Sequence, residues 1–186
     1  MKLKSLIIGT AAALSVASMA IAERGSDGHV NIIYWQAPSI LNPYLSGGTK
    51  DVESSSMIIE PLARYNQDGE LTAWLVTEIP TVANGGVSAD LMSITWNITP
   101  GIKWSDGSAF TAHDVVFSGE YCMDPDGGCA QSNKLADVAS IEAIDDLTVK
   151  VTFSVAKPFP YGPFVGAEQP IIQKAQFADC MGAEAP

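Results

Sequence analysis

The chain has 186 residues, of which 47% are hydrophobic, and its 21 Asp and Glu against 10 Lys and Arg give a formal net charge of −11. This acidity argues against nucleic acid and anionic membrane surfaces as partners, because both are polyanions. The length is sufficient for one domain with a real hydrophobic core.

The first 22 residues carry the pattern of a secretory signal peptide. Lys2 and Lys4 precede an apolar run, which is followed by small residues ending in Ala20-Ile21-Ala22. A membrane anchor is the competing interpretation, but the strongly apolar part is shorter than the roughly 20 residues that a span requires. The sequence therefore predicts cleavage after Ala22 and export of residues 23–186, without direct insertion into a membrane.

The mature chain begins with a predicted strand, a loop and a helix. Residues 29–36 (HVNIIYWQ) are rich in β-branched and aromatic side chains, and Pro38 follows them, which indicates a strand running into a loop. Residues 41–49 have the Pro, Gly and Asn content of a loop. A helix is expected from about Lys50 to Ile59, with Thr49 as its N-cap.

Three further stretches predict antiparallel strands. Residues 62–74 indicate two short strands around the turn Asp68-Gly69. Residues 93–104 alternate between apolar and polar side chains, and Pro100-Gly101 turns this half-buried strand into a short second one. Residues 139–154 form a hairpin pattern with Asp145-Asp146 at the turn.

The Pro- and aromatic-rich tail after residue 156 is expected to end in a short helix. Mixed strands, short helices and many turns predict a mixed α/β (α+β) domain.

The segment Trp104–Ser118, with the sequence WSDGSAFTAHDVVFS, holds residue types that also occur in hydrolytic sites. Thr111 lies three residues before Asp114, which is the spacing of a capping box at a helix start. Neighbouring helical residues point about 100° apart, so His113 and Asp114 cannot orient one another as a catalytic pair does. We therefore predict a turn, a helix cap and a helix here, with a buried stripe of Ala112, Val115, Val116 and Gly119.

Other candidate reactive groups are also given structural interpretations. Acidic clusters such as Asp51–Glu53 and Asp145-Asp146 are interpreted as solvated turns, and no cofactor or metal ion is expected. Cys122 and Cys129 bracket a turn-rich loop, and export favours a disulfide between them over a metal site. Cys180 is left without an assigned partner, which hints at an incomplete molecule.

Residues 98–118, ITPGIKWSDGSAFTAHDVVFS, resemble the signature segment of the extracellular solute-binding proteins of the peptide/nickel class. The supporting stretches come in the family's order: APSILNP, IIEPLARYNQDGELTAWLV, EYCMDPDGGCA, SIEAIDDLTVKVTFS and QPIIQK. One departure follows Trp74, where the family's second Trp is replaced by Ile79-Pro80. The chain also resembles only the opening part of the larger lobe of these two-lobed proteins.

The resemblance implies a periplasmic, monomeric receptor that delivers a small solute to the permease of an ABC importer and closes two lobes on it. Peptides lead as ligands, while nickel complexes, opines and short oligosaccharides stay open. This portion alone is expected to bind ligand weakly or not at all. A secreted interaction module and, less favoured, a secreted hydrolase are the alternative functions.

The same resemblance places the exit of the first strand at the ligand cleft. The expected contacts are Trp35, Gln36, Ala37 and Pro38, with Tyr44 as a weaker candidate. Trp35 would stack on the ligand or line a pocket, while the backbone of Gln36 and Ala37 would pair with an extended ligand. At least one of Tyr34 and Trp35 is expected in the core.

Overall fold

The computed structural model describes residues 28, 29 and 31–182, so the predicted signal peptide, residues 1–22, lies outside the described part. Of the described residues, those up to Ile33 belong to one unit, and those from Tyr34 onward belong to a second unit. Within residues 29–36, the described positions belong to no strand. The predicted strand is therefore wrong here, because a strand exists only where a neighbouring strand supplies hydrogen-bond partners, and none in the described part does so.

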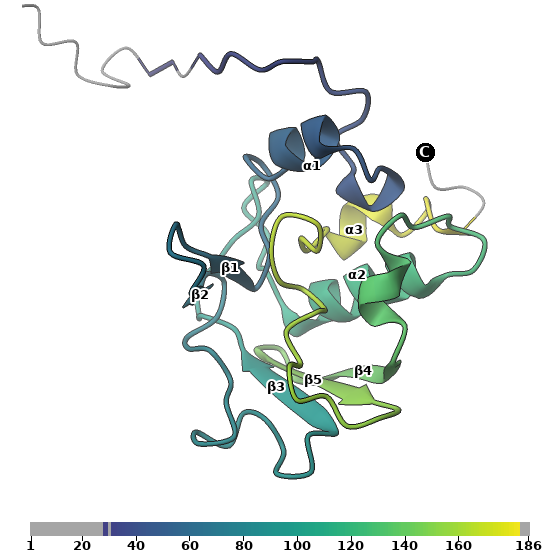
Figure 1. Cartoon of the computed structure of the whole chain (residues 1–186). Coiled ribbons are helices and arrows are strands. Elements are labelled where there is room, and N and C mark those ends of the chain that lie inside the picture. The colour runs from purple at the N-terminus through teal and green to yellow at the C-terminus, as the bar shows by residue number, and fades with distance from the viewer. Residues whose placement is uncertain (1–27, 30, 183–186) are drawn as a thin grey trace, which may run out of the picture. The chain divides into compact units, whose positions relative to one another are not determined.

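The second unit is a mixture of short helices and antiparallel strands, as predicted (Figure 1). In chain order its elements are the 3₁₀ helix η1 (Pro43–Leu45), α1 (Thr49–Ser55), β1 (Ala63–Tyr65), β2 (Leu71–Ala73), β3 (Ser93–Asn97), α2 (Ala112–Met123), the 3₁₀ helix η2 (Ser132–Leu135), β4 (Val138–Asp145), β5 (Thr148–Phe153) and α3 (Lys174–Phe177).

The main sheet has three antiparallel strands in the order β3-β5-β4. Ile94 pairs with Val151, which also pairs with Ile141, so three apolar side chains form one row on the same face. The alternation predicted for residues 93–104 is confirmed, because Ile94, Trp96 and Ile98 are buried. The turn at Asp145-Asp146 joins β4 to β5, again as predicted.

Helix α2 packs against β4 and β5 (Figure 1). At Gly119, an added Cβ would lie 2.2 Å from Cδ1 of Ile141 and 3.1 Å from Cζ of Phe164. Glycine therefore lets the helix lie close to the sheet. Of the predicted stripe, Ala112, Val115 and Gly119 are buried, whereas Val116 is only half-buried. The buried face of the helix also includes Phe117 and Ser118, so it is displaced away from Val116.

Strands β1 and β2 form the predicted hairpin around Asp68-Gly69. Gly69 has a φ of 79°, in the left-handed region that glycine adopts without a steric penalty. The short second strand expected after Pro100-Gly101 is reduced to a single bridge between Lys103 and Ala109. The Asp106-Gly107 turn lies between these two residues, and the backbone N–H groups of Trp104 and Phe110 donate to the carbonyls of Ser108 and Ile102 on either side of the bridge.

The two longer helices begin differently: α1 has no side-chain cap, whereas α2 has a capping box. Helix α1 begins at Thr49 with Gly48 as N-cap, one residue before the predicted cap, and it ends at Ser55 rather than Ile59. Helix α2 begins with the predicted capping box of Thr111 and Asp114.

The predicted disulfide between Cys122 and Cys129 is present, with an S–S distance of 1.99 Å. It closes the loop between α2 and η2. The backbone N–H of Ala130, directly after this loop, donates to the carbonyl of Tyr44 at 2.7 Å. The bridge therefore fixes the loop that supports η1. Cys180 has a free thiol and is half-buried.

Candidate functional site

Four of the five predicted ligand residues form an exposed segment at the start of the second unit. Trp35 is 70% exposed, and Gln36, Ala37 and Pro38 are also exposed and outside any helix or strand. Tyr34 is half-buried, so neither aromatic residue belongs to the core, and the expectation that one of them would is wrong. We call residues Trp35–Pro38 the exit segment. Its contact with a ligand stays a prediction.

Helix α1 holds the exit segment at both ends. Before the segment, the hydroxyl of Tyr34 donates a hydrogen bond to the carboxylate of Glu53. After it, the backbone N–H groups of Ser39 and Ile40 donate to Oδ1 of Asp51, at 2.6 and 3.4 Å. The two acidic side chains lie on one helix, so the four exposed residues span the space between two fixed points.

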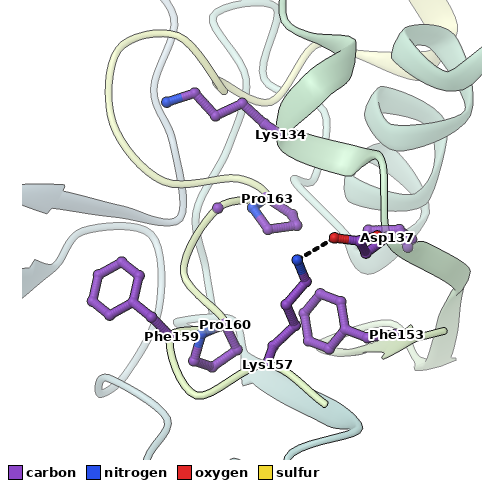
Figure 2. A pocket seen from close by; sticks show the side chains of 9 residues that line it. Lys134, Asp137, Phe153, Lys157, Phe159, Pro160 and Pro163 are labelled. Carbon is purple, nitrogen blue, oxygen red and sulfur yellow. Dashed lines mark hydrogen bonds and ion pairs between the residues drawn. The ribbon is translucent and has the colours of Figure 1, made fainter. Parts of the chain in front are cut away.

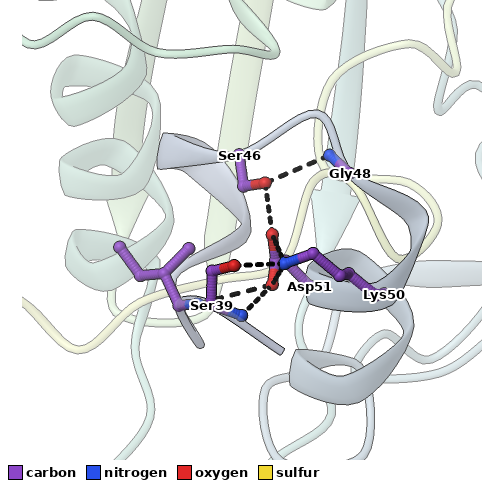
Figure 3. A network of polar contacts seen from close by, with 6 residues as sticks. Ser39, Ser46, Gly48, Lys50 and Asp51 are labelled. Carbon is purple, nitrogen blue, oxygen red and sulfur yellow. Dashed lines mark hydrogen bonds and ion pairs between the residues drawn. The ribbon is translucent and has the colours of Figure 1, made fainter. Parts of the chain in front are cut away.

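Asp51 is the centre of this polar network (Figure 3). Its Oδ2 accepts a hydrogen bond from the hydroxyl of Ser46 at 2.7 Å, and Nζ of Lys50 lies 2.8 Å from its Oδ1. Lys50 also donates to the hydroxyl of Ser39. These bonds from Lys50 and Ser46, followed by the two backbone amides, hold the pKa of the Asp51 carboxyl well below its usual range.

The burial of Asp51 corrects the interpretation of residues 51–53 as a solvated turn, because Asp51 is only 3% exposed. An acidic residue in the first turn of a helix is the one sequence signal that points to this role, since such residues pair with free backbone amides nearby. The pattern does not reveal that the amides come from an earlier loop.

Tyr44 occupies a different environment from the exit segment. Its ring is fully buried, its centroid lies 6.0 Å from that of Tyr121, and its hydroxyl donates to the carbonyl of Pro170. Burial raises the pKa of Tyr44. The contact of Tyr44 with a ligand stays a prediction to which this placement lends no support, because the ring is enclosed by protein on all sides.

A groove of about 370 Å³ begins at Leu41, three residues after the exit segment. This volume lies in the range of about 300–1,000 Å³ that is typical of small-molecule sites. Its lining is mainly apolar with a few amide and hydroxyl groups and comprises Leu41, Asn42, Ile58, Ile59, Trp104, Ser105, Ile172, Gln173, Gln176 and Phe177. Such a surface accepts apolar groups and offers hydrogen bonds at its edge. The sequence pattern did not single it out, since four separate segments contribute to it.

A second pocket, lined by residues at the start of β4 and the end of β5, is too small to hold a solute (Figure 2). Its volume is about 50 Å³. Lys157, which lines this pocket, forms an ion pair with Asp137. Lys134, also in the lining, forms an ion pair with Glu168, with 2.8 Å between Nζ and Oε2. These lysines are therefore occupied by carboxylates of the protein itself.

The segment Trp104–Ser118 has the structural role predicted for it. The carboxylate of Asp114, 6% exposed, accepts hydrogen bonds from the backbone N–H groups of Thr111 and Lys174, at 2.9 and 3.0 Å, and from the indole of Trp104 at 3.3 Å. The imidazole of His113 is 60% exposed and lies 3.6 Å from Asp146 instead. His113 and Asp114 therefore do not form a catalytic pair with each other.

The nearby hydroxyl of Ser118 is also fully used by the backbone. It donates to the carbonyl of Asp114 at 2.7 Å and accepts from the N–H of Ile172 at 2.9 Å. This bond links α2 to the chain segment that leads into α3. Within residues 28, 29 and 31–182, no group of three His, Cys, Asp or Glu side chains is arranged to hold a metal ion.

The described helices are all too short or too polar to cross a bilayer.

Comparison with known proteins identifies the family. Residues 70–181 match the family described as bacterial extracellular solute-binding proteins, family 5 Middle. The oligopeptide-binding protein OppA of Bacillus subtilis is 30% identical over 140 residues, which are 67% of this chain and 23% of OppA.

Two solved structures have a similar fold. AppA from Bacillus subtilis, in complex with a nonapeptide, superposes with a TM-score of 0.70 at 18% identity, over 80% of this chain and 28% of AppA. AgaA from A. tumefaciens R10, in complex with agropinic acid, gives a TM-score of 0.67 at 28% identity, over 76% of this chain and 28% of AgaA. The chain thus spans about a quarter of the length of these relatives. It belongs to family 5 of the bacterial extracellular solute-binding proteins.

Proposed function

We propose that the protein to which these residues belong is the substrate-binding component of an ABC importer and captures peptides in the periplasm. The observation that carries the proposal is the 30% identity to an oligopeptide-binding protein over two thirds of this chain. Capture is non-covalent, and the bound peptide is passed to the permease of the importer.

Within this function, the exit segment supplies one edge of the ligand site. Trp35 offers a large apolar surface at 70% exposure, next to the exposed backbone of Gln36 and Ala37, which lies outside any helix or strand. An extended peptide can pair its main chain with such a backbone, while aromatic side chains supply contact area. Two short tethers hold the segment on α1, so that little conformational freedom is lost on binding.

Opines are the second candidate ligands. The relative AgaA, in complex with agropinic acid, is 28% identical to this chain. Peptides are preferred because the match to OppA covers 140 residues of sequence at a higher identity.

The test is to purify the complete product of this gene from the periplasm and to identify the molecules that leave it on denaturation by mass spectrometry. We expect peptides of a few residues, which bind again in calorimetry. Release of an opine, or of no small molecule together with no binding of a peptide library, would contradict the proposal.

The exit segment is tested in the same protein with Trp35→Ala. Removal of an aromatic contact should weaken peptide binding by about 1–2 kcal/mol, or roughly 5- to 30-fold. Phe159→Ala is the matched control, because Phe159 is similarly exposed, at 65%, but lines the small pocket beside β4 and β5. Equal affinities for both variants and the wild type would remove Trp35 from the site.

A further inference from the structure

The exit segment is exposed to solvent, yet hydrogen bonds to α1 restrain its backbone conformation. Its four residues have no helix or strand to hold them, and Trp35 and Pro38 both face solvent. A segment of this kind samples many conformations unless other groups restrain it. The restraint comes from α1, through Glu53 at one end of the segment and Asp51 at the other.

The bond between Asp51 and Ser39 is the stronger candidate for a functional restraint. The N–H of Ser39 lies 2.6 Å from a carboxylate that is 3% exposed, and hydrogen bonds to an ionised acceptor are stronger than neutral ones. The tether of Tyr34 ends on an exposed carboxylate, where water competes for the same bond.

Asp51 also joins the exit segment to a second loop. Its Oδ2 accepts from the hydroxyl of Ser46, which in turn accepts from the N–H of Gly48 at 3.1 Å, directly before α1. The charge of Asp51 is balanced by Lys50, whose side chain is 13% exposed. One buried carboxylate therefore holds two loops and the start of a helix in a single arrangement (Figure 3).

We infer that Asp51 is a positioning residue for ligand binding: by holding the backbone of Ser39 and Ile40, it fixes the exit segment in the conformation that meets the peptide. This inference rests on the proposed function of the exit segment. Asp51 itself does not touch the ligand. It lowers the entropy that the segment loses on binding, since the segment is already ordered before the ligand arrives.

The first measurement needs no ligand. Hydrogen exchange of the complete gene product is compared between the wild type, Asp51→Ala and Asp51→Asn. In Asp51→Ala we expect the amides of Ser39 and Ile40 to exchange roughly tenfold faster or more, while the amides of β3 and β5 keep their rates. Asp51→Asn retains an acceptor oxygen at the same place and should restore most of the protection.

Two results would overturn the inference. Unchanged exchange at Ser39 and Ile40 in Asp51→Ala would show that the tether does not restrain the segment. Faster exchange throughout α1 and the sheet in both variants would show that Asp51 serves folding alone. The matched control is Asp137→Asn, which removes another acid paired with a lysine and should leave the amides of Ser39 and Ile40 unchanged.

The second measurement is the affinity for the peptide identified with the wild type. Asp51→Ala should weaken it by about tenfold, Asp51→Asn by less, and Asp137→Asn not at all. Equal affinity in Asp51→Ala, despite faster local exchange, would contradict the positioning role. If the wild type binds no peptide, the proposed function fails, while the exchange experiment still decides whether Asp51 restrains the segment.

Discussion

The packed region of the second unit and its exit segment use the same residue types in opposite ways. In the packed region Trp96 is fully buried beside Val149, its partner on β5, and the acid Asp114 satisfies backbone amides. In the exit segment Trp35 is 70% exposed, and the restraints lie on either side of it, at the hydroxyl of Tyr34 and the backbone N–H of Ser39.

This difference teaches where a binding surface can lie in such a chain. Asp114 and Ser118 of the segment Trp104–Ser118 are engaged by the protein itself, so they have little capacity left for a solute. In the exit segment, by contrast, the side chains are exposed to solvent, and hydrogen bonds to α1 restrain the residues on either side of the segment. Exposed groups on rigid supports are what a pre-organised site requires.

The largest expected effect is a difference in the free energy of unfolding between substitutions of the two tryptophans. Trp96→Ala should lower the free energy of unfolding by about 3–5 kcal/mol, because it leaves a cavity in the core. Trp35→Ala should change it by no more than about 0.5 kcal/mol. Urea unfolding of the complete gene product measures both values. If Trp35→Ala lowered the free energy of unfolding by several kcal/mol, the exit segment would be part of the core, and the proposed difference between the two regions would be wrong.

The packed region was largely predictable from sequence because its partners are close along the chain. Both hairpins have turns of a few residues, and alternation alone identified the buried faces at Ile94, Trp96 and Val149. The capping box of α2 uses residues three positions apart. In each case the sequence holds both halves of the interaction within a short window.

The exit segment was not predictable in the same way. The composition of residues 29–36 favours a strand, but a strand depends on a neighbour that composition cannot supply. Asp51 was interpreted as solvated because the pattern did not reveal its partners, Ser39 and Ile40, which precede it by 12 and 11 residues in a loop of irregular path. The groove beside Leu41 is assembled from four segments and was missed for the same reason.

A medium effect tests whether the segment Trp104–Ser118 is structural. Asp114→Ala should lower the free energy of unfolding by about 2 kcal/mol, since it leaves the amides of Thr111 and Lys174 without their acceptor. His113→Ala, a change at the adjacent but exposed residue, should alter stability by less than about 0.5 kcal/mol. Thermal and urea unfolding provide the measurement. A hydrolytic activity that disappears in His113→Ala would revive the enzymatic interpretation.

The smallest effect tests whether even an exposed carboxylate of the packed region is engaged. The side chain of Ser108, then the amide of Gln173 at 2.8 Å, and the backbone N–H of Ser108 lower the pKa of Asp106 to about 2. The folded state therefore favours the charged form, so this contribution to stability is complete above a pH of about 4 and is lost as the pH falls toward 2. Carbon NMR of the carboxyl groups should show the low midpoint, and Gln173→Ala should raise it. Gln176→Ala, on the same helix, leaves the partners of Asp106 in place and should not. A midpoint near 4 in the wild type would mean that the Asp106 carboxylate has no lasting hydrogen-bond partners. The difference between the packed region and the exit segment would then hold only for buried groups.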